Sequence, residues 1–383
     1  MGTHIACELG IHSLPVELLA YIAKFTESPD LCALRLTCRA IYQGSLRHFA
    51  QTVVHTLKTD LSPKSLARVE EAANDDIFCP CVRKLEIVRD SQGCLGPFSP
   101  DRTSEGTYIQ AWRDVIKRLF NCQSFELRNS VHATPSAGSD GITLDEATGV
   151  VLEAIATERI PMESFSIDII KYRKRAHQDK DGLTQFAITA FGVPAFANLR
   201  ELSLALPDAE HETIDWMAKM IQCAQSLRKL TIIFSWSCEA TSLLAQISSV
   251  ECLPELQELT FSRMSFQSST ALAIFLYSIQ STLRRATFSF VQLEFGGWRS
   301  ILRELGGGVY RLDSVTLRCI QELDFFLSFR NLPEYPLAEE SLDRRLCRPF
   351  QFCFVDPKDT GFTYSGPALQ QVLQRVVALA ELP

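Results

Sequence analysis

Self-similarity along the chain constrains its fold more than any other feature. The pattern apolar-x-x-apolar-x-apolar recurs eight times between residues 82 and 317. Its eight copies begin at Val82, Cys122, Met162, Leu199, Leu227, Leu256, Leu283 and Leu312. Successive copies start 40, 40, 37, 28, 29, 27 and 29 residues apart, so the last four intervals are nearly equal. A constant period of this length predicts structural repeats that stack on one another.

Amphipathic segments fill the intervals between the apolar stretches. One of them carries Ile214, Met217 and Ile221 at helical spacing, and the other intervals contain similar stripes. A single strand–helix pair cannot bury its apolar side alone, so neighbouring pairs must stack. The sequence therefore predicts an α/β solenoid with a parallel inner sheet. The regular intervals argue against the alternative, an ordinary doubly wound α/β enzyme.

Polar inserts and closing elements complete this picture of the repeats. The three longest intervals contain inserts at residues 89–107, 129–143 and 171–182, which we expect to form loops. Residues 348–355 are rich in phenylalanine and predict a closing strand. The apolar stripe of residues 369–377 predicts a terminal helix that covers the open end of the stack, as solenoids require for solubility.

The amino-terminal segment at residues 13–42 has more apolar side chains than so short a stretch can bury by itself. Apolar residues at helical spacing predict one helix before the turn at residues 28–30, a second after it, and a third at residues 42–54. A further helix is predicted at residues 64–75. We therefore divide the chain into four parts: a flexible terminus at 1–11, a helical module at 12–56, a linking helix at 57–81 and the repeats at 82–383.

The helical module resembles the F-box, a three-helix domain of about forty to fifty residues. The similarity lies in Leu-Pro-x-Glu-Leu-Leu from residue 14, followed by Leu-Arg-Leu-x-Cys-Arg from residue 34. Tyr42 is a departure, because many members carry a tryptophan nearby. The whole chain resembles F-box proteins with leucine-rich repeats, particularly the divergent fungal kind, although it lacks the regular asparagine of such repeats.

The resemblance implies that a Skp-type adaptor covers the exposed face of the module and links it to a cullin–RING ubiquitin ligase. It assigns the primary contact to Leu14 and Pro15. Further candidates, for the interface or for the core of the module, are Leu18, Ile22, Leu31 and Leu34. In physical terms this is a helix whose apolar anchors enter a groove of the partner. The alternative is that these residues only pack the module against the solenoid.

The inner face of the predicted sheet is the candidate surface for a protein substrate. Residues between the apolar positions point out of this face, and six consecutive repeats place serine or threonine in the same row. The candidate substrate-binding residues are Glu201, Ser203, Lys229, Thr231, Glu258, Thr260, Arg285 and Thr287. The alternative is that serine and threonine are present only because they suit a solvated strand.

Composition limits the classes of partner. The formal net charge of −7 gives no general basic field for nucleic acid. No apolar run approaches the roughly 18 residues that span a bilayer, so we expect no membrane partner. The 13 cysteines lack a disulfide-like spacing and no secretory leader is visible, so we expect a reducing compartment, the cytoplasm, the nucleus or both.

No catalytic or cofactor motif emerges from the sequence. Cys79, Cys81 and Cys94 lack the spacing of a zinc site, and no nucleophile–histidine set can be assembled. We expect a protein without a metal or cofactor and without catalytic activity of its own. The leading hypothesis is the substrate receptor of an SCF-type ubiquitin ligase. The alternatives are a repeat scaffold that does not engage the ligase and an α/β enzyme whose site the sequence does not reveal.

Overall fold

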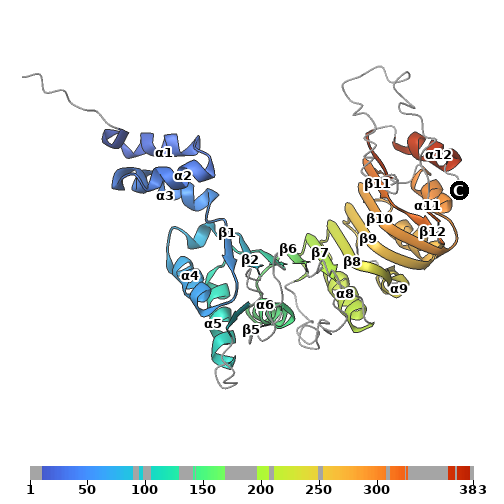
Figure 1. Cartoon of the computed structure of the whole chain (residues 1–383), viewed down its shortest axis with the longest axis horizontal. Coiled ribbons are helices and arrows are strands. Elements are labelled where there is room, and N and C mark those ends of the chain that lie inside the picture. The colour runs from blue at the N-terminus through green and yellow to red at the C-terminus, as the bar shows by residue number, and fades with distance from the viewer. Residues whose placement is uncertain are drawn as a thin grey trace, which may run out of the picture.

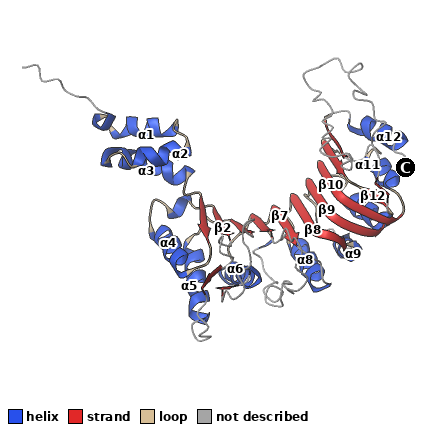
Figure 2. Cartoon of the chain, in the orientation of Figure 1, coloured by secondary structure: helices blue, strands red, loops and turns tan. Residues whose placement is uncertain are grey.

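The structure is a computed structural model, and it describes residues 11–88, 95–97, 105–128, 141–142, 144–168, 196–206, 211–248, 253–307, 311–323, 325–326, 361–366 and 369–379. A small helical module stands at one end of a curved solenoid (Figure 1). Strands line the inside of the arc and helices lie along its outside (Figure 2). The predicted fold class, a helical module followed by a solenoid-like α/β region, is confirmed.

The amino-terminal module consists of η1 (Ile11–Ser13), α1 (Val16–Lys24), α2 (Ser28–Arg35) and α3 (Arg39–Thr52). Leu19, Ala23 and Leu31 are buried in its core together with Ile41. A Cβ atom on Gly44 would lie 2.7 Å from the Cβ of Leu19, closer than real Cβ contacts allow. Glycine at this position therefore lets α3 approach α1 closely.

The sheet follows the order β1-β2-β4-β6-β7-β8-β9-β10-β11-β14, and its neighbours are parallel except for the last pair. The strands are β1 (Thr56–Thr59), β2 (Lys84–Val88), β4 (Ser124–Arg128), β6 (Ser164–Asp168), β7 (Glu201–Leu206), β8 (Lys229–Glu239), β9 (Glu258–Ser268), β10 (Arg285–Phe295), β11 (Ser314–Arg318) and β14 (Gly361–Ser365). All eight predicted stretches are strands of this sheet. Their register confirms that equivalent repeat positions lie side by side.

A repeated backbone contact fixes this register at the start of the strands. The carbonyl of Arg83 accepts hydrogen bonds from the N–H groups of Gln123 and Ser124 in the next repeat. The same arrangement recurs from repeat to repeat, and the carbonyl of Arg200 accepts from Arg228 and Lys229. Because buried backbone groups must be paired, this shared acceptor holds neighbouring repeats in one alignment.

The outer layer consists of helices that pack against the sheet and against one another. They are α4 (Pro63–Asn74), α5 (Glu105–Arg118), α6 (Leu144–Glu158), α8 (His211–Cys223), α9 (Thr241–Ser248), α10 (Ser269–Ser278), α11 (Trp298–Leu305) and α12 (Leu369–Leu379). One continuous hydrophobic core lies between the two layers. Trp112, Trp216 and Trp298 are fully buried in it, one from each of three outer helices.

The sheet begins one strand earlier than the pattern predicts. Strand β1 pairs in parallel with β2, with Leu57 beside Leu85, inside the segment that the sequence assigns to a linking helix. The predicted helix of that segment is present as α4. Thr59 stands where the repeat pattern has an apolar residue, and its hydroxyl forms a hydrogen bond of 2.8 Å with Ser65. A polar residue that is buried through a local hydrogen bond escapes a search for apolar periodicity.

Strands near the carboxyl-terminal end are longer than the repeat pattern indicates. Strands β9 and β10 continue past Arg263 and Phe290, which have positive φ angles of 58° and 56°. Cys319, at the equivalent place after β11, has a φ of 48°. Non-glycine residues seldom adopt this conformation. At these three equivalent positions the chain therefore turns the same corner in each repeat, and β12 (Gln321–Glu322) then pairs with β10.

The carboxyl-terminal end is closed by β14 and α12. Strand β14 pairs with β11 in the antiparallel sense, and α12 packs against α11. The predicted terminal helix is thus present, whereas the predicted strand at residues 348–355 lies outside the described residues. The three inserts lie largely outside them too; short strands β3 (Leu95–Pro97) and β5 (Gly141–Ile142), from the first two, pair with each other. A last short strand, β13 (Phe325–Phe326), pairs with β12.

Candidate adaptor-binding site

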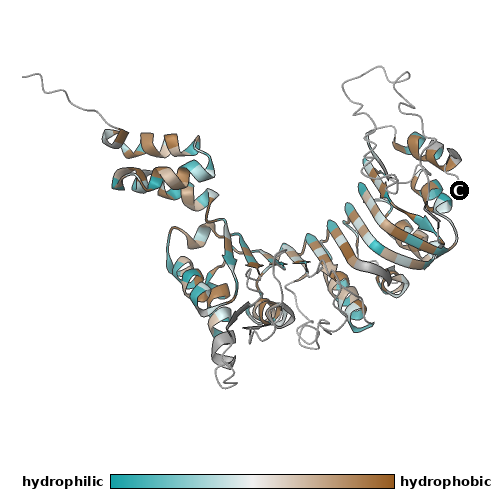
Figure 3. Cartoon of the chain, viewed as in Figure 1, coloured by the Kyte–Doolittle hydropathy of each residue, from teal (hydrophilic) through white to brown (hydrophobic). Residues whose placement is uncertain are grey.

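An apolar surface covers the outer side of α1. Leu18, Tyr21 and Phe25 are 49%, 59% and 73% exposed in the whole protein, so neither the module nor the solenoid covers them. The rings of Tyr21 and Phe25 meet edge to face with their centroids 4.9 Å apart. Figure 3 shows that hydrophobic residues continue along this helix. Clustered, exposed aromatic and aliphatic side chains are typical of protein-interaction sites.

The candidate adaptor-binding residues divide into exposed and buried groups. Pro15 and Leu18 are exposed, and Leu14 is half-buried beside them at the start of α1. Ile22 and Leu34 are also half-buried. Leu31 is completely buried and therefore belongs to the core of the module. Exposure of Pro15 and Leu18 argues against the alternative that these residues only pack the module onto the solenoid.

Two residues of the apolar surface were not among the sequence-based candidates. Tyr21 and Phe25 lie on the same side of α1 as Leu18, at spacings of three and seven residues. In the sequence, Phe25 belongs to one apolar stripe that also contains Leu18, Leu19 and Ile22. The stripe is in fact divided, because Leu19 faces α3 whereas Phe25 faces solvent. Apolar periodicity predicts the helix but does not say which part of a broad stripe is covered.

Arg35 connects α2 to α3 behind this surface. Its guanidinium carbon lies 4.4 Å from the ring centroid of Tyr42 and 3.5 Å from that of Phe49. The side chain is 91% buried, since its exposed fraction is 9%. The buried Nε atom has no hydrogen-bond partner among the described residues, and the two aromatic rings stabilise the charge of the guanidinium group. Arg35 therefore fixes the orientation of α2 on α3.

The candidate substrate-binding residues lie in two rows on the inner sheet. Ser203, Thr231, Thr260 and Thr287 are register neighbours and all are half-buried. We call the set Ser166, Ser203, Thr231, Thr260, Thr287 and Thr316 the hydroxyl row. Thr316 pairs in register with Thr363 of β14, which extends the row by one more strand. Seven strands thus present small hydroxyl groups along one line.

The second row carries charges of alternating sign. Glu201, Lys229, Glu258 and Arg285 follow one another across four strands. Arg285 and Glu258 form an ion pair of 2.7 Å. Glu201 and Lys229 have no ionic partner among the described residues, although they are exposed neighbours in register. These two charges are therefore available to a partner.

Acidic residues replace the hydroxyl row in the first repeats. Glu86 and Glu126 are buried on the inner face and pair with basic residues of their own or adjacent strands. Lys58 and Arg128 each lie 3.6 Å from Glu86, and Glu126 pairs with Lys84 and Arg128. Burial raises the pKa of Glu126, but hydrogen bonds from Arg128 and Lys84 outweigh it and hold the pKa below its ordinary value. This end of the inner face is therefore already neutralised by its own ion pairs.

Within the described part of the chain, no three His, Cys, Asp or Glu side chains are grouped so that they could hold a metal ion. Cys79 and Cys81 instead direct their thiols to the backbone carbonyls of Arg118 and Ile77. None of the described helices combines the length and the hydropathy needed to cross a bilayer.

Comparison with known families identifies the helical module. Residues 11–44 match the F-box domain. F-box domains bind Skp-type adaptors in cullin–RING ligases, and F-box proteins are generally non-catalytic substrate receptors. The match supports an F-box protein and a role as the adaptor-binding part of an SCF-type ubiquitin ligase. The parallel sheet suggests a repeat solenoid, but no leucine-rich-repeat family is identified. No curated protein matches the chain significantly.

Proposed function

We propose that this protein is the substrate receptor of an SCF-type ubiquitin ligase, active in the cytoplasm, the nucleus or both. The F-box binds the Skp-type adaptor, and the leucine-rich-repeat-like solenoid binds a protein that is to be ubiquitylated. The exposed apolar surface of α1 is the observation that carries the proposal, since it lies within the matched F-box. The transfer chemistry belongs to other subunits, so the receptor contributes binding surfaces and no catalytic group.

The adaptor contact rests on Pro15, Leu18, Tyr21 and Phe25. Full burial of a large apolar side chain contributes roughly 1.5–3 kcal/mol. Two such anchors are therefore enough to change the affinity by more than tenfold, because about 1.4 kcal/mol corresponds to a factor of ten. Leu14 contributes its exposed part, while Leu31 contributes only by supporting α1 and α2 from the core.

A binding measurement with purified adaptor tests this assignment. We expect Leu18→Ala/Phe25→Ala to lower the affinity at least about tenfold, because both side chains are already exposed and their loss leaves no cavity. Ile274→Ala/Tyr277→Ala on α10 is the matched control, since it also removes two exposed apolar side chains. Equal adaptor binding by the wild type and the α1 variant would favour the scaffold hypothesis.

Substrate binding is assigned to the inner face of the sheet. The hydroxyl row offers donors and acceptors across several strands, and Glu201 and Lys229 form no ion pair with any other residue that the structure describes. An arc that is lined by strands presents one continuous surface to a protein partner. The first repeats contribute less, because their charges already pair with one another.

Substrate binding by the inner face is tested in cells in which a variant gene replaces the chromosomal copy. Proteins that accumulate when the gene is deleted are expected to accumulate also when Lys229→Glu/Thr231→Arg is the only copy. Lys64→Glu, an exposed change on α4, should keep their levels normal. Normal levels in the inner-face variant would place substrate recognition elsewhere on the protein.

A further inference from the structure

A cavity lies between the helical module and the first repeats. It has a volume of about 600 Å³ and is bounded by α3 on one side and by the segment around η2 (Cys79–Cys81) on the other. Residues 53–55 alone connect α3 to β1, so the cavity lies at the joint between the two parts of the protein. It is separate from the apolar surface of α1, because Gly44 faces α1 whereas Gln43, Arg47 and Gln51 line the cavity.

The lining combines apolar and cationic groups. Leu46, Ile77 and Pro80 supply apolar surface from both sides. Arg47 and Arg83 come from opposite sides of the cavity, and neither forms an ion pair with another described residue. An apolar wall with a few convergent polar groups is the usual composition of a small-molecule site.

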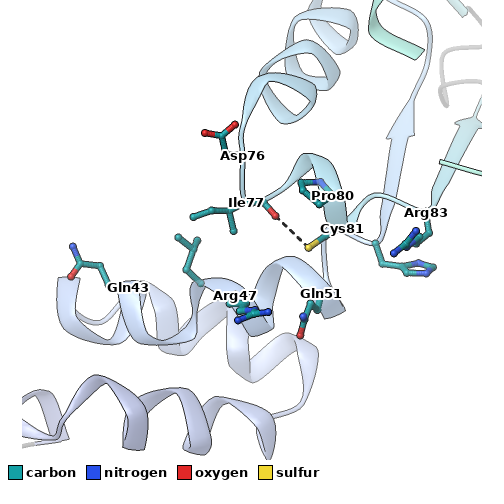
Figure 4. A pocket seen from close by; sticks show the side chains of 10 residues that line it. Gln43, Arg47, Gln51, Asp76, Ile77, Pro80, Cys81 and Arg83 are labelled. Atoms are coloured by element: carbon teal, nitrogen blue, oxygen red, sulfur yellow. Dashed lines mark hydrogen bonds between the residues drawn. The ribbon is translucent and has the colours of Figure 1, made fainter. Parts of the chain in front are cut away.

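Charge is distributed unevenly in the cavity. In the view of Figure 4, Asp76 and Gln43 lie toward one end and Arg83 toward the other, with Arg47 and Gln51 between them. Asp76 is the only carboxylate in the lining, against two guanidinium groups, and His55 adds an imidazole ring. Guanidinium groups bind carboxylates and phosphates through paired hydrogen bonds.

We propose that this cavity binds a small molecule with an apolar body and one anionic group, a phosphate or a carboxylate. The anionic group lies between Arg47 and Arg83, and the apolar body contacts Leu46, Ile77 and Pro80. Because Arg47 lies on α3 of the helical module and Arg83 directly before β2, a bound anion joins the two parts. The ligand therefore restricts movement between the helical module and the solenoid. It fixes the orientation of the proposed adaptor-binding module relative to the proposed substrate-binding surface.

The half-exposed thiol of Cys81 in the lining provides a local test. Mass spectrometry measures the alkylation rate of each cysteine in the full chain. The measurement is repeated in the presence of phenyl phosphate, benzoate or benzyl alcohol at millimolar concentration. We expect phenyl phosphate or benzoate to slow alkylation of Cys81 at least about threefold, and the more effective of the two identifies the preferred anion. The exposed Cys32 on α2 should react at an unchanged rate.

Two variants separate anion binding in the cavity from other causes of slower Cys81 alkylation. Arg47→Gln and Arg83→Gln should each remove the protection of Cys81, whereas Arg39→Gln, exposed on α3 outside the cavity, should keep it. Each protein is first shown to unfold at the wild-type temperature, so that loss of protection reports on the site. The proposal is overturned if neither anion protects Cys81, if benzyl alcohol protects equally, or if the two lining variants behave like wild type.

Discussion

The charged residues of the first repeats show how single side chains set the pH range of stability. The pKa of Glu126 is held below its ordinary value by Arg128 and Lys84, so the folded state binds this proton less readily than the unfolded chain. The stabilisation is therefore complete above the unfolded pKa of about 4.3 and disappears as the pH falls through the lower folded value. Ionisation of Glu126 therefore does not change the stability of the protein between pH 6 and 8.

Glu126→Gln tests this dependence. We expect the variant to lower the urea midpoint of unfolding at pH 7, because Lys84 and Arg128 lose their common partner. At pH 3, which lies below the unfolded pKa, the difference from wild type should be smaller, since the unfolded chain then takes up the proton that the folded state binds less readily. Glu163→Gln is the control: that residue is half-buried, and its ion pair with Arg200 is longer, at 3.7 Å. A deficit of the same size at both pH values would contradict an electrostatic role for Glu126.

Cys122 illustrates how burial controls reactivity. Burial raises the pKa of its thiol to about 12, so almost no thiolate exists at neutral pH. We expect Cys122 to remain unmodified by iodoacetamide in the native protein and to react fully after denaturation. Exposed Cys32 should react rapidly in both states, which checks that the reagent is active. Rapid native labelling of Cys122 would show that β4 opens readily.

At the scale of elements, α2 depends on one buried cation. Arg35→Lys keeps the charge but removes the planar group between Tyr42 and Phe49, so we expect the opening free energy of the α2 amides to fall by about 1–2 kcal/mol. Native-state hydrogen exchange measures this quantity helix by helix. Arg39→Lys, which changes an exposed arginine of α3, should leave α2 protection unaltered. Equal protection in both variants would mean that apolar packing alone holds α2.

Elements with a strict apolar period were predictable from the sequence. Elements in which a polar residue is buried, or in which a non-glycine residue has a positive φ angle, were not. All eight apolar stretches became strands, because each alternates one buried and one solvated side. Strand β1 was missed because Thr59 is buried through a hydrogen bond, and the corners at Arg263 and Phe290 carry no glycine to mark them. The match of residues 11–44 supports the F-box prediction, but exposure of Tyr21 and Phe25 depends on what covers α1, which periodicity does not encode.

At the scale of the whole molecule, the proposed binding surfaces lie on separate parts, one on the helical module and one on the solenoid with its continuous core. The apolar surface of α1 lies at one end of the arc, while the hydroxyl row runs along its inside (Figure 1). In a solenoid each repeat contacts mainly its neighbours, so a change in one surface has little effect on a distant one. This arrangement suits a protein that holds an adaptor and a substrate at the same time.

The same continuity leaves the last repeat without a neighbour, and α12 takes that place. Leu369, Val372, Leu373 and Val376 are buried where α12 covers α11. Leu373→Asp introduces a charge into this contact, so we expect α12 to detach and the apolar side of α11 to become exposed. The variant should then self-associate with rising concentration in sedimentation velocity, and it should unfold at a lower temperature than wild type.

Gln371→Asp introduces the same charge on the exposed side of α12 and should sediment like wild type. This comparison separates loss of the cap from a general effect of added negative charge. If Leu373→Asp keeps the wild-type sedimentation and unfolding temperature, α12 is not needed to close the stack. The end of the sheet would then be protected by β14 alone, whose antiparallel pairing with β11 already satisfies the backbone of the last parallel strand.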